Sequence, residues 1–140
     1  MEFCIENGIL RDFKDEEAHT RITIPHGVRV IGEAAFADNE FLYHVVIPDT
    51  VERIERDAFL NCYSLSWVLI PDSVWYIGYD AFYECQNLKN INIPNTVKGI
   101  ECFSFYGCTN LASITIPEGV TIIEHSAFQG CTSLTSVTIP

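Results

Sequence analysis

All six prolines of this 140-residue chain recur at intervals of 23 residues, each at the end of a short apolar segment. The first segment reads ITIP, and the later ones read VVIP, VLIP, INIP, ITIP and VTIP. The prolines are Pro25, Pro48, Pro71, Pro94, Pro117 and Pro140. Self-similarity at a fixed period of roughly 20 to 50 residues is typical of stacked repeats, in which one unit cannot bury its apolar face alone. The chain is therefore predicted to form a solenoid.

Four further residue types recur in register with the prolines. Each repeat reads approximately V/I-x-I-P-x-x-V-x-x-I-x-x-x-A-F-x-x-C-x-x-L-x-x, and five full repeats run from Ile22 to Ser136, followed by a partial sixth. The position before the recurring Phe is Ala in every repeat but one, which has Ser104. The recurring positions are Val28, Val51, Val74, Val97 and Val120; Ile31, Ile54, Ile77, Ile100 and Ile123; Phe36, Phe59, Phe82, Phe105 and Phe128; and Leu42, Leu65, Leu88, Leu111 and Leu134.

The apolar segment before each proline is predicted to be a strand with one buried face. Ile91 and Ile93 lie two residues apart, which sends both side chains to the same side of a strand. Proline should end the strand, because it has no N–H for a parallel ladder. The V-x-x-I segment after this corner could form a second short extended segment, and the A-F-x-x-C segment a single 3₁₀ or α turn. Pairing between coils would stack the phenylalanines into a spine.

The repeat unit resembles that of the BspA-like, or Treponema pallidum, class of leucine-rich repeats, which is similar to LxxIxIPxxVxxIGxxAFxxCxxL. The resemblance covers Ile22 to Pro140, although the family's Gly after the isoleucine occurs only as Gly32 and Gly78. It implies a leucine-rich repeat solenoid with a parallel β-sheet on the concave side. Short extended or 3₁₀ segments would form the convex side, with little helix.

The segment FCIENGILRDF also resembles the strand pair that precedes the first repeat in bacterial members of this family. We therefore expect residues 1–21 to form an N-terminal capping segment and residues 22–140 to form the leucine-rich repeat domain. The resemblance further implies protein binding without enzymatic activity, often in adhesins at the bacterial cell surface.

Composition excludes several other classes of partner. The chain is 48% hydrophobic and 19% charged, which indicates one ordinary core. Its formal net charge of -11, without any run of Lys or Arg, argues against binding to nucleic acid or anionic membranes. No segment approaches the roughly 18 apolar residues of a membrane span.

The start, MEFCIENGIL, lacks the pattern of an export signal, which favours a cytoplasmic location. The family resemblance instead implies a secreted or cell-surface location.

Four of the six cysteines occupy one column of the repeat and are expected to be buried, reduced thiols. They are Cys62, Cys85, Cys108 and Cys131, and Asn39 fills the same position in the first repeat, where it could satisfy backbone groups. Free Cys behaves as a small hydrophobe, and no C-x-x-C spacing occurs. Cys4 and Cys102 lie outside the column without obvious mates. We expect neither a disulfide framework nor a metal site, and no cofactor.

No catalytic motif is present, so the chain is predicted not to be an enzyme. A pairing of Cys102 with His125, at the same position of adjacent repeats, is one alternative, but two ordinary neighbours on the convex side are the simpler interpretation. The acidic run from Asp15 to Glu17 could hold a divalent cation, although a solvated turn between the cap and the first repeat fits better.

Variable columns on the predicted sheet are the candidate binding positions, because the repeat framework specifies the others. One outward column runs Arg21, His44, Trp67, Asn90, Ser113 and Ser136, and the next runs Thr23, Val46, Leu69, Asn92, Thr115 and Thr138. An exposed aromatic and aliphatic cluster on a sheet is typical of an interaction site. The predicted partner-binding residues are Tyr43, His44, Val46, Trp67 and Leu69. The cap or a second copy could instead cover them. A more dispersed cluster of Trp75, Tyr76, Tyr79 and Tyr83 is expected on the opposite side.

Two functions remain open at this stage. The first is a non-enzymatic, adhesin-like protein-binding module of unknown partner. The second is a structural, self-associating solenoid segment, joined through the apolar patch or through the C-terminal end. That end lacks a polar cap, so a homo-oligomer or a longer natural chain is expected there.

Overall fold

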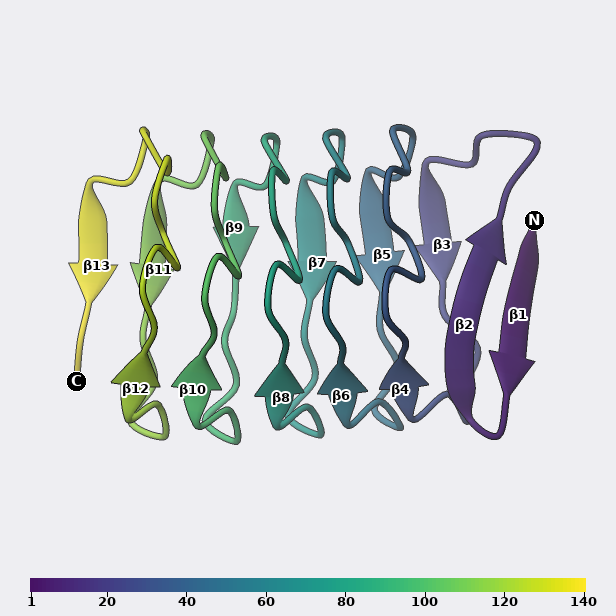
Figure 1. Ribbon diagram of the computed structural model, residues 1–140, viewed down its shortest axis with the longest axis horizontal. Helices are drawn as coiled ribbons and strands as arrows, with labels where there is room; N and C mark the ends of the chain where they lie inside the picture. Colours follow the sequence, from purple (N-terminus) through teal and green to yellow (C-terminus); the bar gives the residue numbers. More distant parts are fainter.

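The computed structural model describes residues 1–140, which form thirteen β-strands and no helix. Most of the strands stack in two rows along one axis (Figure 1), with the chain termini at opposite ends. The proline row contains the strands that lead into the prolines: β3 (Arg21–Thr23), β5 (His44–Val46), β7 (Trp67–Leu69), β9 (Asn90–Ile91), β11 (Ser113–Thr115) and β13 (Ser136–Thr138). The isoleucine row contains β4 (Val30–Ile31), β6 (Arg53–Ile54), β8 (Tyr76–Ile77), β10 (Gly99–Ile100) and β12 (Ile122–Ile123). This β-solenoid confirms the predicted leucine-rich repeat architecture.

Strands of successive coils pair in parallel, each residue opposite the residue 23 positions later, and the ladders are interrupted only between β8 and β10 and between β9 and β11. In the proline row Arg21 pairs with His44, His44 with Trp67, and Trp67 with Asn90. The last strands of that row and the pairs within the isoleucine row keep the same offset. The columns of the sequence are therefore ladders of the structure, as predicted from the repeat.

Each proline of the five full repeats forms a corner. The N–H of Val28 donates to the carbonyl of Pro25 at 3.3 Å, and Val51 donates in the same way to Pro48 at 3.1 Å. The bond closes a tight turn after the proline and recurs in the next three coils. The prediction that the prolines end the strands and turn the chain is confirmed.

The segment around each recurring Phe is a chain of turns rather than a helix. Ala35, Ala37 and Asn39 donate to the carbonyl three residues earlier, as in a 3₁₀ turn. The alternate N–H groups of Ala34 and Phe36 instead donate to carbonyls of the next coil, at 3.0 and 2.9 Å. No continuous helix forms, because pairing between coils uses every second donor of the segment.

The recurring phenylalanines stack along the centre of the solenoid. Neighbouring rings from Phe36 to Phe128 are nearly parallel, with interplanar angles of 2 to 5° and centroids 5.0 to 5.5 Å apart. Phe36 to Phe105 are fully buried, whereas Phe128 is only partly buried. Such pairs contribute roughly 0.5 to 1.5 kcal/mol each beyond the area they bury. The predicted spine is confirmed.

The cysteine column, comprising Cys62, Cys85, Cys108 and Cys131, runs beside this spine. Each thiol donates to the carbonyl of the Phe 26 residues earlier, at 3.1 to 3.3 Å. Burial raises the pKa of Cys62 to about 12 and raises the pKa of Cys85 and Cys108 as well. All six cysteines are free thiols. In the first repeat, Asn39 Oδ1 accepts the N–H groups of Phe41 and Leu42 at 3.1 and 3.0 Å, which confirms that it satisfies backbone groups.

An antiparallel hairpin precedes the first repeat. Strands β1 (Glu2–Glu6) and β2 (Ile9–Lys14) are joined by Asn7 and Gly8, both with positive φ, as a two-residue hairpin turn requires. β2 extends the isoleucine row by pairing in parallel with β4. Leu10 is fully buried, and the ring of Phe13 lies 5.2 Å from that of Phe36. The hairpin therefore covers the first coil.

The last coil is more open than the others. Ile123 is 46% exposed, whereas the equivalent isoleucines of the earlier coils are at most 2% exposed. Val137 and Ile139 are also exposed. The structure contains no helix with the length and apolarity needed to cross a membrane.

Candidate partner-binding surface

The outward face of the proline row carries the predicted binding residues. Along β7 the central Val68 is buried, while Trp67 is 40% and Leu69 53% exposed. β5 alternates in the same way, with Val45 buried and Val46 exposed. Because the two strands pair in register, Val46 lies opposite Leu69 and His44 opposite Trp67. The predicted register of this face is confirmed, and partner binding by it stays a prediction.

Arg21, His44 and Trp67 form a linked column across three coils. Arg21 Nη2 lies 2.8 Å from His44 Nδ1, and the rings of His44 and Trp67 meet edge to face, with centroids 4.2 Å apart. Partial burial lowers the pKa of His44, and the nearby positive charge of Arg21 lowers it further. Since a guanidinium can only donate, Nδ1 is the acceptor and the neutral ring carries its proton on Nε2. That nitrogen is buried and has no hydrogen-bond partner.

The rest of the face is polar and uncharged. Its outward positions in β9, β11 and β13 are Asn, Ser and Thr. The Asn92 amide donates to the carbonyl of Ile70 at 2.7 Å, and its oxygen accepts the Ile70 N–H at 3.0 Å. This side chain takes the place of ladder bonds where β9 ends. None of the outward positions in the proline row is acidic, although the chain contains 19 acidic residues.

Two exposed aromatic residues precede β5. Tyr43, a predicted binding residue, is more than half exposed, and its carbonyl accepts the N–H of Ser66 at 3.0 Å. Its ring forms no pair with those of His44 and Trp67. Phe41 is exposed to a similar degree and was not predicted as part of the surface. The signal that could have found it is its column, which holds Ser or Asn in the other repeats.

The second predicted aromatic cluster lies on the isoleucine row, on the other side of the solenoid. The Arg53 guanidinium carbon is 5.1 Å from the Trp75 ring centroid and 4.9 Å from that of Tyr76. Tyr83 stacks on Tyr106, with centroids 4.7 Å apart. Several aromatic faces of this cluster are thus occupied by neighbours from the same chain.

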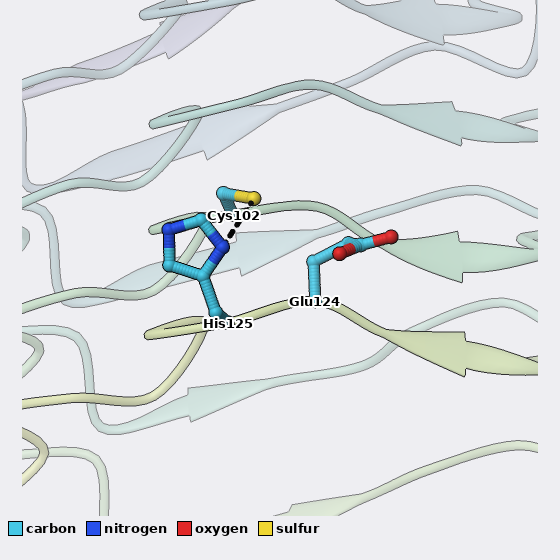
Figure 2. Close-up of side chains that lie close together, drawn as sticks. All are labelled: Cys102, Glu124 and His125. Atoms are coloured by element: carbon cyan, nitrogen blue, oxygen red, sulfur yellow. Dashed lines mark hydrogen bonds between the residues drawn. The ribbon is translucent and has the colours of Figure 1, made fainter.

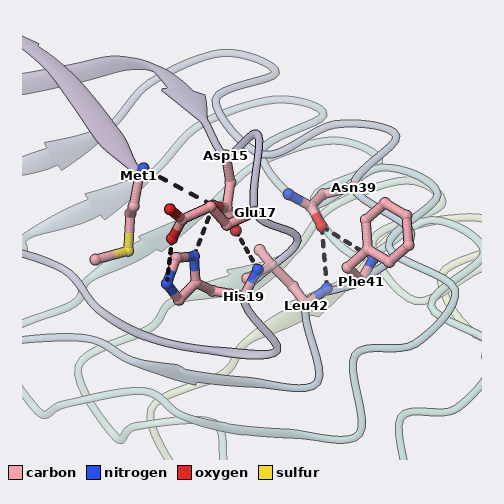
Figure 3. Close-up of polar contacts among 7 residues, drawn as sticks. All are labelled: Met1, Asp15, Glu17, His19, Asn39, Phe41 and Leu42. Carbon is pink, nitrogen blue, oxygen red and sulfur yellow. Dashed lines mark hydrogen bonds and ion pairs between the residues drawn. The ribbon is translucent and has the colours of Figure 1, made fainter.

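The acidic run of the sequence lies in the turn between the hairpin and the first repeat (Figure 3). His19 Nδ1 is 2.7 Å from Asp15 Oδ1, and His19 Nε2 is 3.3 Å from Glu17 Oε2. The N-terminal ammonium of Met1 lies 3.9 Å from Asp15. Two of the three acidic side chains are therefore engaged by cationic or hydrogen-bonding groups of the same chain.

Cys102 and His125 meet in the turns that follow β10 and β12. Cys102 Sγ lies 3.2 Å from His125 Nδ1, and the two side chains point toward each other (Figure 2). Glu124 lies beside them. The adjacency that the repeat spacing suggested for Cys102 and His125 is confirmed.

Comparison with known proteins agrees with this geometry. Residues 11–135 match the BspA type leucine rich repeat region in six copies. A comparison with curated proteins finds no match. A leucine-rich cell surface protein from Faecalibacterium prausnitzii is 33% identical, with a TM-score of 0.89 over 94% of this chain and 35% of its own. A leucine-rich repeat protein from Bacteroides ovatus is 38% identical, with a TM-score of 0.84 over 99% of this chain and 39% of its own.

The leucine-rich repeat protein of Treponema pallidum is also similar in structure. It is 26% identical, with a TM-score of 0.88 over 97% of this chain and 67% of its own. The chain thus spans from about a third to two thirds of the length of these crystal structures. Because the repeat match covers nearly the whole chain, the protein belongs to the BspA-type leucine-rich repeat family.

Proposed function

We propose that the chain is a non-enzymatic protein-binding module and that the outward face of the proline row is its concave binding surface. The observation that carries this proposal is the cluster of exposed Val46, Trp67 and Leu69 on two paired strands, beside His44 and Tyr43. Exposed aromatic and aliphatic residues on a rigid scaffold favour interaction, because they bury large areas at little entropic cost.

Charge supports a protein partner over a nucleic acid. A chain with a net charge of -11 repels phosphate backbones, and the proposed face contributes only Arg21 as a charged group. We further propose an adhesin-like role at the cell surface. The Faecalibacterium prausnitzii structure, described as a cell surface protein, supports this role by likeness alone. Residues 1–21 act in this proposal as the cap of the repeat domain.

The test compares two tryptophans on opposite sides of the same solenoid. Wild type, Trp67→Ala and Trp75→Ala would each be immobilised and exposed to extracted surface proteins. A partner retained by wild type would then be purified and its affinity measured. We expect Trp67→Ala to weaken binding at least about tenfold, as for a central interface residue, and Trp75→Ala to leave it unchanged. Equal affinity of wild type and Trp67→Ala would reject this surface.

Self-association is the second candidate, and the exposed Ile123, Val137 and Ile139 of this chain favour it. Sedimentation velocity over a wide concentration range would detect an oligomer. A dimer that Ile123→Lys dissociates would identify the last coil as the contact. A dimer that only Trp67→Ala dissociates would instead assign the proline-row face to self-association.

A further inference from the structure

Cys102, Glu124 and His125 bring three different metal-binding chemistries to one place on the isoleucine-row side. The thiol sulfur, the imidazole nitrogen and a carboxylate oxygen all lie within 4.8 Å of one another (Figure 2). Cys102 is half-buried, while Glu124 and His125 are exposed. A tetrahedral Zn²⁺, with ligand bonds of about 2.0 to 2.3 Å, separates sulfur from nitrogen by roughly 3.5 Å. The observed separation of 3.2 Å is close to that spacing.

The surroundings favour a cation. Glu101 directly precedes Cys102 in the chain and adds a second carboxylate to this part of the surface. Neither Glu124 nor His125 forms an ion pair within the chain, in contrast to His19 and His26, which lie beside carboxylates. Negative charge at this place is therefore not neutralised by a basic side chain.

The imidazole is also held in place by packing. The ring of Phe103 meets that of His125 edge to face, with centroids 5.2 Å apart and an interplanar angle of 81°. Phe103 itself has a positive φ of 58° and lies in the turn segment that follows β10. A ligand whose ring is oriented before binding loses less entropy when it coordinates an ion.

We propose that Cys102, Glu124 and His125 bind a divalent cation of the Zn²⁺ type, with water in the fourth coordination position. Sulfur and imidazole nitrogen favour Zn²⁺ over Mg²⁺ and Ca²⁺, which prefer oxygen ligands. Binding releases the thiol proton to solvent, and the Glu124 carboxylate, within 4.8 Å of the other two ligand atoms, supplies the third ligand. Searches for local motifs such as C-x-x-C miss such a site, because parallel pairing makes residues 23 positions apart into neighbours.

The experiment titrates Zn²⁺ into the reduced, full 140-residue chain by calorimetry, in the presence of excess Ca²⁺ to occupy nonspecific carboxylates. We expect one equivalent to bind, and Cys102→Ser or His125→Gln to lower the affinity at least about tenfold. Matched controls are Cys4→Ser and His26→Gln, which remove the same residue types elsewhere and should bind as wild type. Circular dichroism would verify that every variant is folded.

Co²⁺ supplies a second readout that identifies the sulfur ligand. Wild type loaded with Co²⁺ should show thiolate-to-metal charge-transfer absorption, and Cys102→Ser should lose it while Cys4→Ser keeps it. The proposal is overturned if Cys102→Ser binds Zn²⁺ as tightly as wild type, or if the two control variants weaken binding as much as the site variants do.

Discussion

Replacing Phe82 with Leu should destabilise the fold about twice as much as the same change at Phe128. Phe82 lies in the middle of the spine and stacks on two rings, Phe59 at 5.2 Å and Phe105 at 5.5 Å. Phe128 stacks on Phe105 alone, at 5.4 Å. Leucine keeps most of the apolar volume, so the change isolates the loss of ring pairs from the loss of buried area.

The magnitude follows from the number of pairs removed. At roughly 0.5 to 1.5 kcal/mol for each pair, Phe82→Leu should lower the free energy of unfolding by about 1 to 3 kcal/mol, and Phe128→Leu by about half of that. The partial burial of Phe128 increases the contrast, because its neighbours can relax toward solvent. A change of this size is a large fraction of the roughly 5 to 15 kcal/mol that stabilises an ordinary domain.

The assay is urea denaturation followed by circular dichroism and tryptophan fluorescence, with coincident transitions required before free energies are compared. Phe82→Ala extends the series, with a loss of about 3 to 5 kcal/mol. If Phe82→Leu and Phe128→Leu cost the same, the stacked rings add nothing beyond buried area, and the argument for the spine fails.

Three further predictions concern His44, the cysteine column and Asn39. Because burial and Arg21 hold the pKa of His44 below its unfolded value of about 6.5, the neutral ring contributes stability that is lost as pH falls through the folded pKa. His44→Gln should flatten this part of the pH profile of unfolding free energy, and an unchanged slope would contradict the assignment. In the absence of denaturant, a thiol reagent should modify Cys4 rapidly, whereas it should reach Cys62, Cys85 and Cys108 only after unfolding. Rapid labelling of these three thiols in the native protein would disprove their burial. Asn39→Ala removes the acceptor of two backbone N–H groups and should cost about 1 to 3 kcal/mol in urea denaturation, whereas the neighbouring Glu40→Ala should be nearly neutral.

Much of the fold was predictable from the sequence because a solenoid converts a period into a register. Once every coil has the same length, residues 23 positions apart must lie opposite each other, whatever the details of the turns. The inward and outward faces of β5 and β7 follow from the two-residue alternation of a strand. The phenylalanine spine, the cysteine column and the position of Trp67 beside His44 are all consequences of these two periodicities.

Features that depend on side-chain direction and on contacts between coils were decided by the tertiary structure alone. The segment around each Phe forms 3₁₀-type turns but no continuous helix, because the next coil takes half of its N–H groups. Asn92, expected only to face outward, bonds to the backbone of Ile70. The distance between Cys102 and His125 depends on rotamers, which no column can specify. Sequence alone therefore determined which residues are neighbours, whereas the packed structure determined which of those neighbours touch.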